Sequence, residues 1–341
     1  MSEYYNKNLR ILVGKLETTP GTMETLTNSD FDVRVRNPEV SLAIEVDDEA
    51  SKYANGYHTE DEVVMGTQQG QITFDIRMTC AGTVTSEPKW WKFAKGCGLK
   101  SRTWTTNGIG LNPRKEYDES TMTIWVYDIQ RGASPSAVCY KFAGCMGNMT
   151  IGAEGVGKPW IANFTFTGKV YDVDMNVSNA DILELFNPDT TCSDKMLKDT
   201  IMVGDTTENC SSFMLDLGND IQGQVNQADD SGFDYFAITA RRPRLTLNPL
   251  MKNTRDVWGD LTSGLTGCPG TYELFIGDTG LNNKYTLRIP KAQIISGTPA
   301  DQNGFVSWDQ NWKLLTNGTT GALADSDLTQ EDTFELLQGS R

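Results

Sequence analysis

Hydrophobic and polar residues alternate in two long stretches of the chain that resemble each other. The first covers residues 137–173 and the second covers residues 285–317. Each stretch has an opening alternating run, a turn with small residues and a glycine, and a closing alternating run that holds a tryptophan. A period of two residues is typical of half-buried strands, so each stretch predicts a β-hairpin. The inward residues are Val138, Tyr140, Phe142, Trp160, Ala162, Phe164 and Phe166 in the first hairpin, and Tyr285, Leu287, Ile289, Val306, Trp308, Trp312 and Leu314 in the second.

Shorter patterns around the two hairpins follow the same order in each half of the chain. The first half has strands on either side of Pro38, an acidic loop over 45–66, a strand over 70–80, a short helix over 88–99 and a strand over 122–126. The second half has a strand over 212–217, an acidic loop over 218–231, a strand region over 233–250, a short helix near 256–265 and a strand over 272–276. This common order predicts a duplicated unit.

The length of the chain and the repeat predict two domains. A chain of 341 residues exceeds the size of a typical single core. We place a first β domain over 1–175, an inter-domain connection over 176–209, a second β domain over 210–320 and an acidic C-terminal arm over 321–341. The predicted fold class is all-β with short flanking helices, in two tandem β-sandwich or barrel domains.

Composition and charge narrow the function classes. The formal net charge of −15 argues against binding nucleic acid by neutralising phosphates. No apolar run approaches the length of a membrane span, and the first residues lack the apolar stretch of a secretion signal, so we expect a soluble protein made in the cytosol.

The residues that usually carry catalysis or bind metals do not form a motif in this chain. Its one histidine is His58, in an acidic loop, and no Gly-x-Ser-x-Gly elbow accompanies it. The seven cysteines are scattered without a Cys-x-x-Cys pair, and we interpret them as small buried hydrophobic residues. We therefore expect a protein that is not an enzyme, with no cofactor, no metal site and no catalytic residue.

Three weaker patterns do not change this expectation. The glycine-rich stretch 152–158 lacks the spacing of a phosphate-binding loop and joins two strands, so we predict a hairpin loop. The carboxylates of the acidic loops lack the ligand order of a calcium-binding EF-hand. A pair of carboxylates for glycoside cleavage stays open, because their separation depends on the fold.

Charged residues in loops and arms are the candidate sites for contacts between subunits. Arg242 and Arg244 form the one local basic cluster, and strand alternation would put them on one face, where acidic loops of a neighbouring subunit could reach them. The acidic candidates are Asp47, Asp48, Glu49, Glu60, Asp61, Glu62, Asp229, Asp230, Asp325, Asp327, Glu331 and Asp332.

Several segments resemble the tail tube proteins of long-tailed bacteriophages. In the first half these are KLETTPGTMET near the N-terminus, VVMGTQQGQITFDIRM over 63–78 and PKWWKFAKGCGL over 88–99. In the second half FMLDLGN, ITARRPRLTLNP and IPKAQI also look like that family. The resemblance spans most of the chain, and its motifs are patterns of β structure.

The resemblance implies a structural subunit that self-assembles into stacked rings around a channel. Double-stranded DNA would pass through this electronegative channel into the host without specific binding. The duplicated unit favours three chains per ring over six, and the further partners would be the tape measure, terminator and distal tail proteins. The expected location is the tail of the virion, assembled in the host cytoplasm. The alternative hypothesis is a two-domain β-sandwich adhesin or receptor-binding module of a virion.

Overall fold

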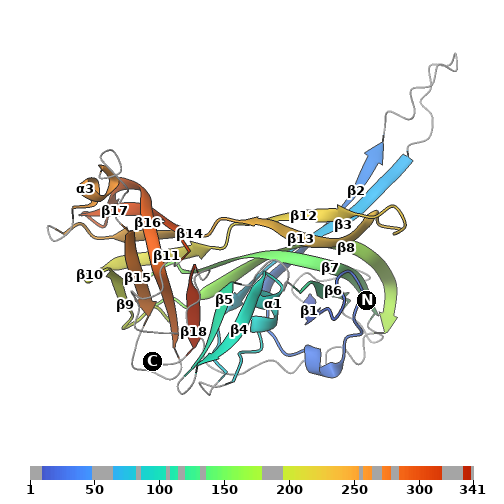
Figure 1. The fold of residues 1–341 in the computed structure, drawn as a ribbon. Helices are drawn as coiled ribbons and strands as arrows, with labels where there is room; N and C mark the ends of the chain where they lie inside the picture. Colours follow the sequence, from blue (N-terminus) through green and yellow to red (C-terminus); the bar gives the residue numbers. More distant parts are fainter. Residues whose placement is uncertain are drawn as a thin grey trace, which may run out of the picture.

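The fold consists mainly of antiparallel β-strands (Figure 1). The computed structural model describes residues 10–47, 64–81, 86–104, 108–113, 120–130, 136–178, 195–252, 256–262, 271–277, 284–316 and 333–338. Within them the helices are short: the 3-10 helix η2 (Asn28–Asp30), α1 (Trp91–Lys95) and α3 (Val257–Thr262). The predicted all-β class with short flanking helices is confirmed.

The strands of the first half include two that are 18 residues long, β7 (Ser136–Ala153) and β8 (Ile161–Ser178). The others are β1 (Ile11–Leu16), β2 (Arg36–Asp47), β3 (Val64–Arg77), β4 (Leu99–Trp104), β5 (Gly108–Pro113) and β6 (Met122–Ile129). Glycine and proline separate these strands, as expected for residues that end extended segments.

The strands of the second half are shorter, apart from β16 (Tyr285–Gln302). The others are β9 (Thr200–Val203), β10 (Thr206–Glu208), β11 (Cys210–Asp216), β12 (Asn219–Val225), β13 (Phe233–Arg241), β14 (Arg244–Pro249), β15 (Thr271–Gly277), β17 (Phe305–Leu314) and β18 (Glu335–Gln338). The hairpins predicted over 137–173 and 285–317 are confirmed as the pairs β7–β8 and β16–β17.

The strands pair in the same order in both halves. In the first half the antiparallel order is β1-β6-β7-β8-β3-β2. In the second half it is β9-β15-β16-β17-β14-β11. The helix with a tryptophan lies after β3 in one half and after β14 in the other. The order of pairing is therefore repeated, although the two halves share little sequence.

One sheet runs through both halves. Strand β11 pairs with β14 on one edge and with the C-terminal part of β7 on the other, with Leu215 opposite Ile151. Strand β18 bridges the halves a second time, because it pairs with both β16 and β5. The domain boundaries at 175 and 209 stay a prediction, and the stretch between them includes β9 and β10.

The main hydrophobic core also draws on both halves. The ring of Trp160, just before β8, meets the Phe213 ring of β11 with centroids 4.6 Å apart. The Tyr285 hydroxyl of β16 donates to the Thr79 carbonyl at 2.7 Å and accepts from the Trp90 indole nitrogen at 3.1 Å. Aromatic burial of this kind contributes strongly to stability, so the halves hold each other in place.

Two sequence interpretations are corrected by the fold. Residues 31–35 do not form a strand, although their residues alternate; β2 begins only at Arg36. The C-terminal segment is not wholly an arm, because Phe334 and Leu336 are completely buried in or beside β18. Alternation along the sequence could not show that β18 pairs with β16 and β5, which lie far away in the chain.

Candidate assembly surfaces

The acidic residue Asp229 makes its contacts within the chain. Its carboxylate accepts from the Lys169 ammonium of β8 at 2.7 Å and from the Ser231 hydroxyl and amide. Burial raises the pKa of Asp229, but the hydrogen bonds from Lys169 and Ser231 together outweigh it, so the pKa lies below its ordinary value. Asp229 thus fastens the turn between β12 and β13 to the first half, whereas its neighbour Asp230 is exposed.

The two arginines proposed to share a strand face are separated by a break. Strand β13 ends at Arg241 and β14 begins at Arg244, because Pro243 interrupts the ladder between them. Arg242 lies in this break and is exposed. Arg244 is half-buried, and its Nη1 atom has no hydrogen-bond partner. Only Arg242 is freely presented to a neighbour, so the two do not form one basic face.

The remaining candidates fall at or beyond the limits of the described chain. Asp47 is the last residue of β2, and its side chain lies outside the described part. The structure does not describe Asp48, Glu49, Glu60, Asp61, Glu62, Asp325, Asp327, Glu331 or Asp332. Their proposed role in subunit contacts stays a prediction.

The hairpin β12–β13 lies over the sheet of the first half (Figure 1). Phe236 and Ile238 of β13 are buried against Met146 of β7. At the base of the hairpin, the side-chain amide nitrogen of Asn219 donates to the backbone carbonyls of Cys97 and Gly147 at 3.0 and 2.9 Å. We call this contact, together with the β11–β7 pairing, the internal junction.

A buried carboxylate prepares the surface on which this hairpin rests. Glu17, within the KLETTPGT motif, accepts hydrogen bonds from Thr121, Thr123 and the amides of Gly21 and Gly144 at 2.5 to 2.9 Å. Both glycines have positive φ values, +76° and +62°, and a Cβ on either would collide with the backbone of β13. The motif therefore shapes a site for the hairpin.

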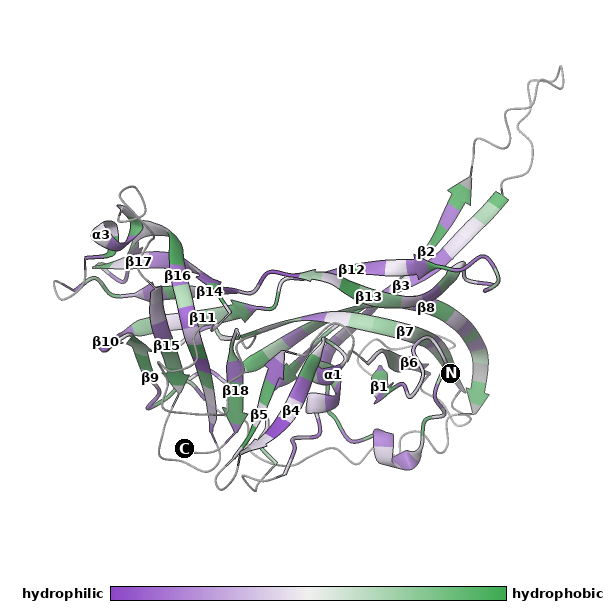
Figure 2. Cartoon of the chain, in the orientation of Figure 1, coloured by the Kyte–Doolittle hydropathy of each residue, from purple (hydrophilic) through white to green (hydrophobic). Residues whose placement is uncertain are grey.

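The hairpin β2–β3 projects away from the rest of the chain, and the outer ends of its strands are largely apolar (Figure 2). Leu42, Ile44 and Val46 follow one another with period two on β2, and their exposed fractions are 44%, 52% and 51%. Val64 and Met65 at the start of β3 are exposed as well. Since alternation puts the three β2 residues on one face, the hairpin presents an apolar stripe to its surroundings. Met65 is directly opposite Val46 and shares its face. We call Leu42, Ile44, Val46 and Met65 the hairpin stripe.

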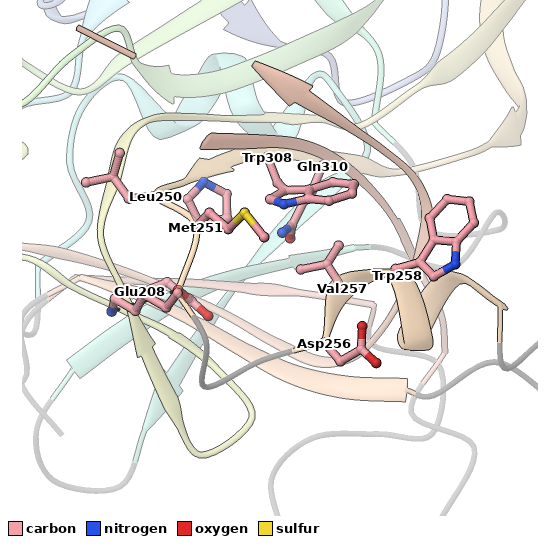
Figure 3. A pocket seen from close by; sticks show the side chains of 10 residues that line it. Glu208, Leu250, Met251, Asp256, Val257, Trp258, Trp308 and Gln310 are labelled. Atoms are coloured by element: carbon pink, nitrogen blue, oxygen red, sulfur yellow. Dashed lines mark ion pairs between the residues drawn. The ribbon is translucent and has the colours of Figure 1, made fainter. Parts of the chain in front are cut away.

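The second half has an open apolar surface beside α3 (Figure 3). A cavity of about 90 Å³ lies there between α3, β17 and the end of β14, and its walls include Met251, Val257, Trp258 and Trp308. Met251 and Trp258 are 59% and 65% exposed, and the neighbouring Val306 is 55% exposed. Glu208, Lys252, Asp256 and Gln310 also line it, so the cavity combines apolar walls with polar groups, as a surface for a protein partner can.

The described residues include no group of three or more His, Cys, Asp or Glu side chains that could hold a metal ion. Cys80, Cys97, Cys139, Cys145 and Cys210 are free and buried, as predicted for these five. Burial raises the pKa of the Cys139 thiol to about 12, and it also raises the pKa of Cys97 and Cys145, so these thiols stay protonated. His58, Cys192 and Cys268 lie outside the described residues.

The charged candidates were predictable from the sequence, whereas the exposed apolar residues of the hairpin stripe were not. The alternation of Val40, Leu42 and Ile44 was recognised as a strand, and a strand of that pattern is normally assumed to face its own core. The signal that could have revealed the hairpin stripe is its position directly beside the acidic loop 45–66.

Comparison with known proteins gives this chain no family. No family model matches its sequence, and no curated protein matches it. None of the helices described is both long enough and apolar enough to cross a membrane.

Proposed function

We propose that this chain is the structural subunit of a bacteriophage tail tube. Its copies assemble into rings that stack around an electronegative channel, and genomic DNA passes through this channel into the host. The chain works by shape and charge and has no catalytic role. Its tail location, its assembly in the host cytoplasm and its contacts with tape measure, terminator and distal tail proteins belong to the same proposal.

The observation that carries the proposal is a β-sheet that is continued from one half to the next through β11 and β7. Each half repeats the same order of strands, so the chain already contains two neighbouring units of a series. A series of like units joined edge to edge closes into a ring when its successive rotations bring the last unit back to the first. Two units per chain favour three chains in a ring of six units.

The charge of the chain suits a passage for DNA. The formal net charge is −15, and a wall of the same sign as phosphate keeps the polyanion from binding. The ammonium group of Lys169 pairs with Asp229, and that of Lys141 pairs with Asp172, so neither is a free cation. DNA could then move along the channel without being held.

Electron microscopy of the purified chain at rising concentration tests this function. We expect stacked rings or tubes of uniform width with an axial channel. A single monomeric species at every concentration would contradict the proposal. If that monomer also bound glycans, the alternative adhesin would be supported instead.

A further inference from the structure

The repeated strand order lets each residue of one half be matched with a residue of the other. The Met78 amide donates to the Trp160 carbonyl at 3.0 Å, and the Met251 amide donates to the Val306 carbonyl at 2.8 Å. Met78 follows β3 and Met251 follows β14, while Trp160 precedes β8 and Val306 lies in β17. Each bond therefore continues the pairing of corresponding strands, β3 with β8 and β14 with β17. Ladder bonds recur every two residues, so these two bonds alone leave several alignments open. The sequences ITFDIRM (72–78) and LTLNPLM (245–251) favour the one in which Met78 corresponds to Met251 and Trp160 corresponds to Val306.

The same register identifies the counterpart of β11. Ile72 lies six residues before Met78 and pairs with Val40 of β2. Leu245 lies six residues before Met251 and pairs with Leu215 of β11. Val40 thus corresponds to Leu215. Two residues further along each strand, Leu42 corresponds to Leu217.

The register also shows which part of β16 corresponds to the edge of β7 that pairs with β11. Ile151 of β7 faces Ala162, two residues after Trp160, and Pro299 of β16 faces Trp308, two residues after Val306. Position 299 is therefore the counterpart of position 151. No described strand pairs with β16 beyond Gln293 on the edge where β15 ends.

Residues that are buried at the internal junction have exposed counterparts elsewhere. Trp160 and Met78 are fully buried, and the Trp160 ring packs against Phe213 and Tyr285 of the second half, whereas Val306 and Met251 are exposed beside the cavity. Leu217 is fully buried, and its amide donates to Met149 of β7, whereas Leu42 is exposed on the hairpin stripe. Positions that are buried at the internal junction in one half are thus exposed to solvent in the other half.

We propose that the first half of a second copy covers the second half of this chain, in the manner of the internal junction. Strand β2 of one copy pairs antiparallel with the β16 edge of the next, with Val40 opposite Pro299 and Ser41 opposite Thr298. The Leu42 amide donates to the Gly297 carbonyl, and the hairpin stripe lies over β16 and β17. The inference specifies the contact through which the proposed rings would close, and it rests on that self-association.

The occupant has to be another copy because the two surfaces lie far apart on one chain. The β2–β3 hairpin projects from the end of the molecule opposite to α3 and β17 (Figure 1). Pro299 brings no amide hydrogen to this edge, so the Val40 carbonyl gains no ladder bond there, while the Pro299 carbonyl still accepts. The acceptor side also offers the exposed side chains of Ile295 and Val306 to the apolar stripe.

Disulfide cross-linking between two variants that each carry one added cysteine tests the register. Ser41 and Thr298 are both exposed, and their counterparts Asp216 and Thr150 are directly opposite each other in the internal junction. Directly opposite strand positions lie within disulfide reach. Mixed and oxidised S41C and T298C chains should give a covalent dimer that neither variant gives alone. S41C mixed with V156C is the matched control, because Val156 is an exposed loop residue outside both surfaces.

A second variant separates this contact from folding. L42D should keep the melting temperature of the monomer, since Leu42 is exposed there, and should raise the concentration needed for assembly roughly tenfold or more. V156D should assemble normally. Tubes that form without the S41C–T298C cross-link, or that tolerate L42D, would overturn this contact and leave the tube function standing. Absence of any assembly by the unmodified chain would instead remove the proposed function together with this contact.

Discussion

Gly144 shows how a single residue permits the contact between the two halves. Its φ of +62° is a left-handed conformation, and a Cβ there would lie 2.9 Å from the Tyr235 Cα of β13. Its amide also donates to the buried Glu17. The glycine therefore serves both the bend in β7 and the close approach of the hairpin.

Replacing Gly144 by alanine should loosen this contact. The left-handed backbone alone costs about 1 to 2 kcal/mol for a residue with a Cβ, and the collision with β13 adds to this cost. Gly157 is the matched control, because its φ is +79° but a Cβ there meets nothing within 4 Å. Urea unfolding should show a larger loss of stability for G144A than for G157A. Equal losses of unfolding free energy in the two variants would mean that close contact with β13 does not restrict position 144.

The ion pair of Asp229 and Lys169 predicts a dependence of stability on pH. The folded state lowers the pKa of Asp229, so the carboxylate stabilises the fold above its unfolded pKa of about 3.9, and this contribution is lost as the pH falls through the lower folded value. D229N should therefore be less stable than the unmodified chain at pH 6, and the gap should close as the pH falls below about 4.

Thermal melting of both chains from pH 6 downward measures this gap. D230N is the control, since Asp230 is the exposed neighbour in the same turn. A gap for D229N that stays constant down to pH 2.5, or the same gap for D230N, would rule out the ion pair as its cause.

At the scale of elements, the sequence predicts what is local and misses what is distant. The hairpins β7–β8 and β16–β17 could be predicted because both strands and the turn are contiguous and alternate over many residues. Strands β9, β10 and β18 have only three or four residues, too few to show a period, and their partners lie far away in the chain. The pairing of β11 with β7 could not be predicted from the sequence either, because its register depends on tertiary contacts.

Strand β18 should be needed for folding, in contrast to the arm that the sequence suggested. Phe334 and Leu336 are fully buried, and β18 pairs with strands of both halves. Ending the chain at Asp332 should lower stability by several kcal/mol, because loss of one buried Phe already costs about 3 to 5 kcal/mol. Urea unfolding of this truncation, compared with a chain ending at Gln338, measures the effect. Equal stability of the two would show that β18 does not hold the halves together.

At the scale of the whole molecule, the account depends on what the chain leaves uncovered. The internal junction buries Leu217 and Trp160, and the same positions in the other half, Leu42 and Val306, are open. Exposed apolar faces at two ends of one molecule are costly in water unless copies cover one another. Such head-to-tail contacts give a closed ring or an open filament, depending on the turn at each contact.

The mass of the smallest assembly, measured by native mass spectrometry on the unmodified chain, tests whether copies of the chain form a closed ring of three. Three chains of 37.7 kDa give a ring of about 113 kDa, and the account predicts this species and its multiples. A chain that stays at 37.7 kDa at every concentration would contradict self-assembly, and a smallest ring of six chains would contradict the two-unit reading of the repeat.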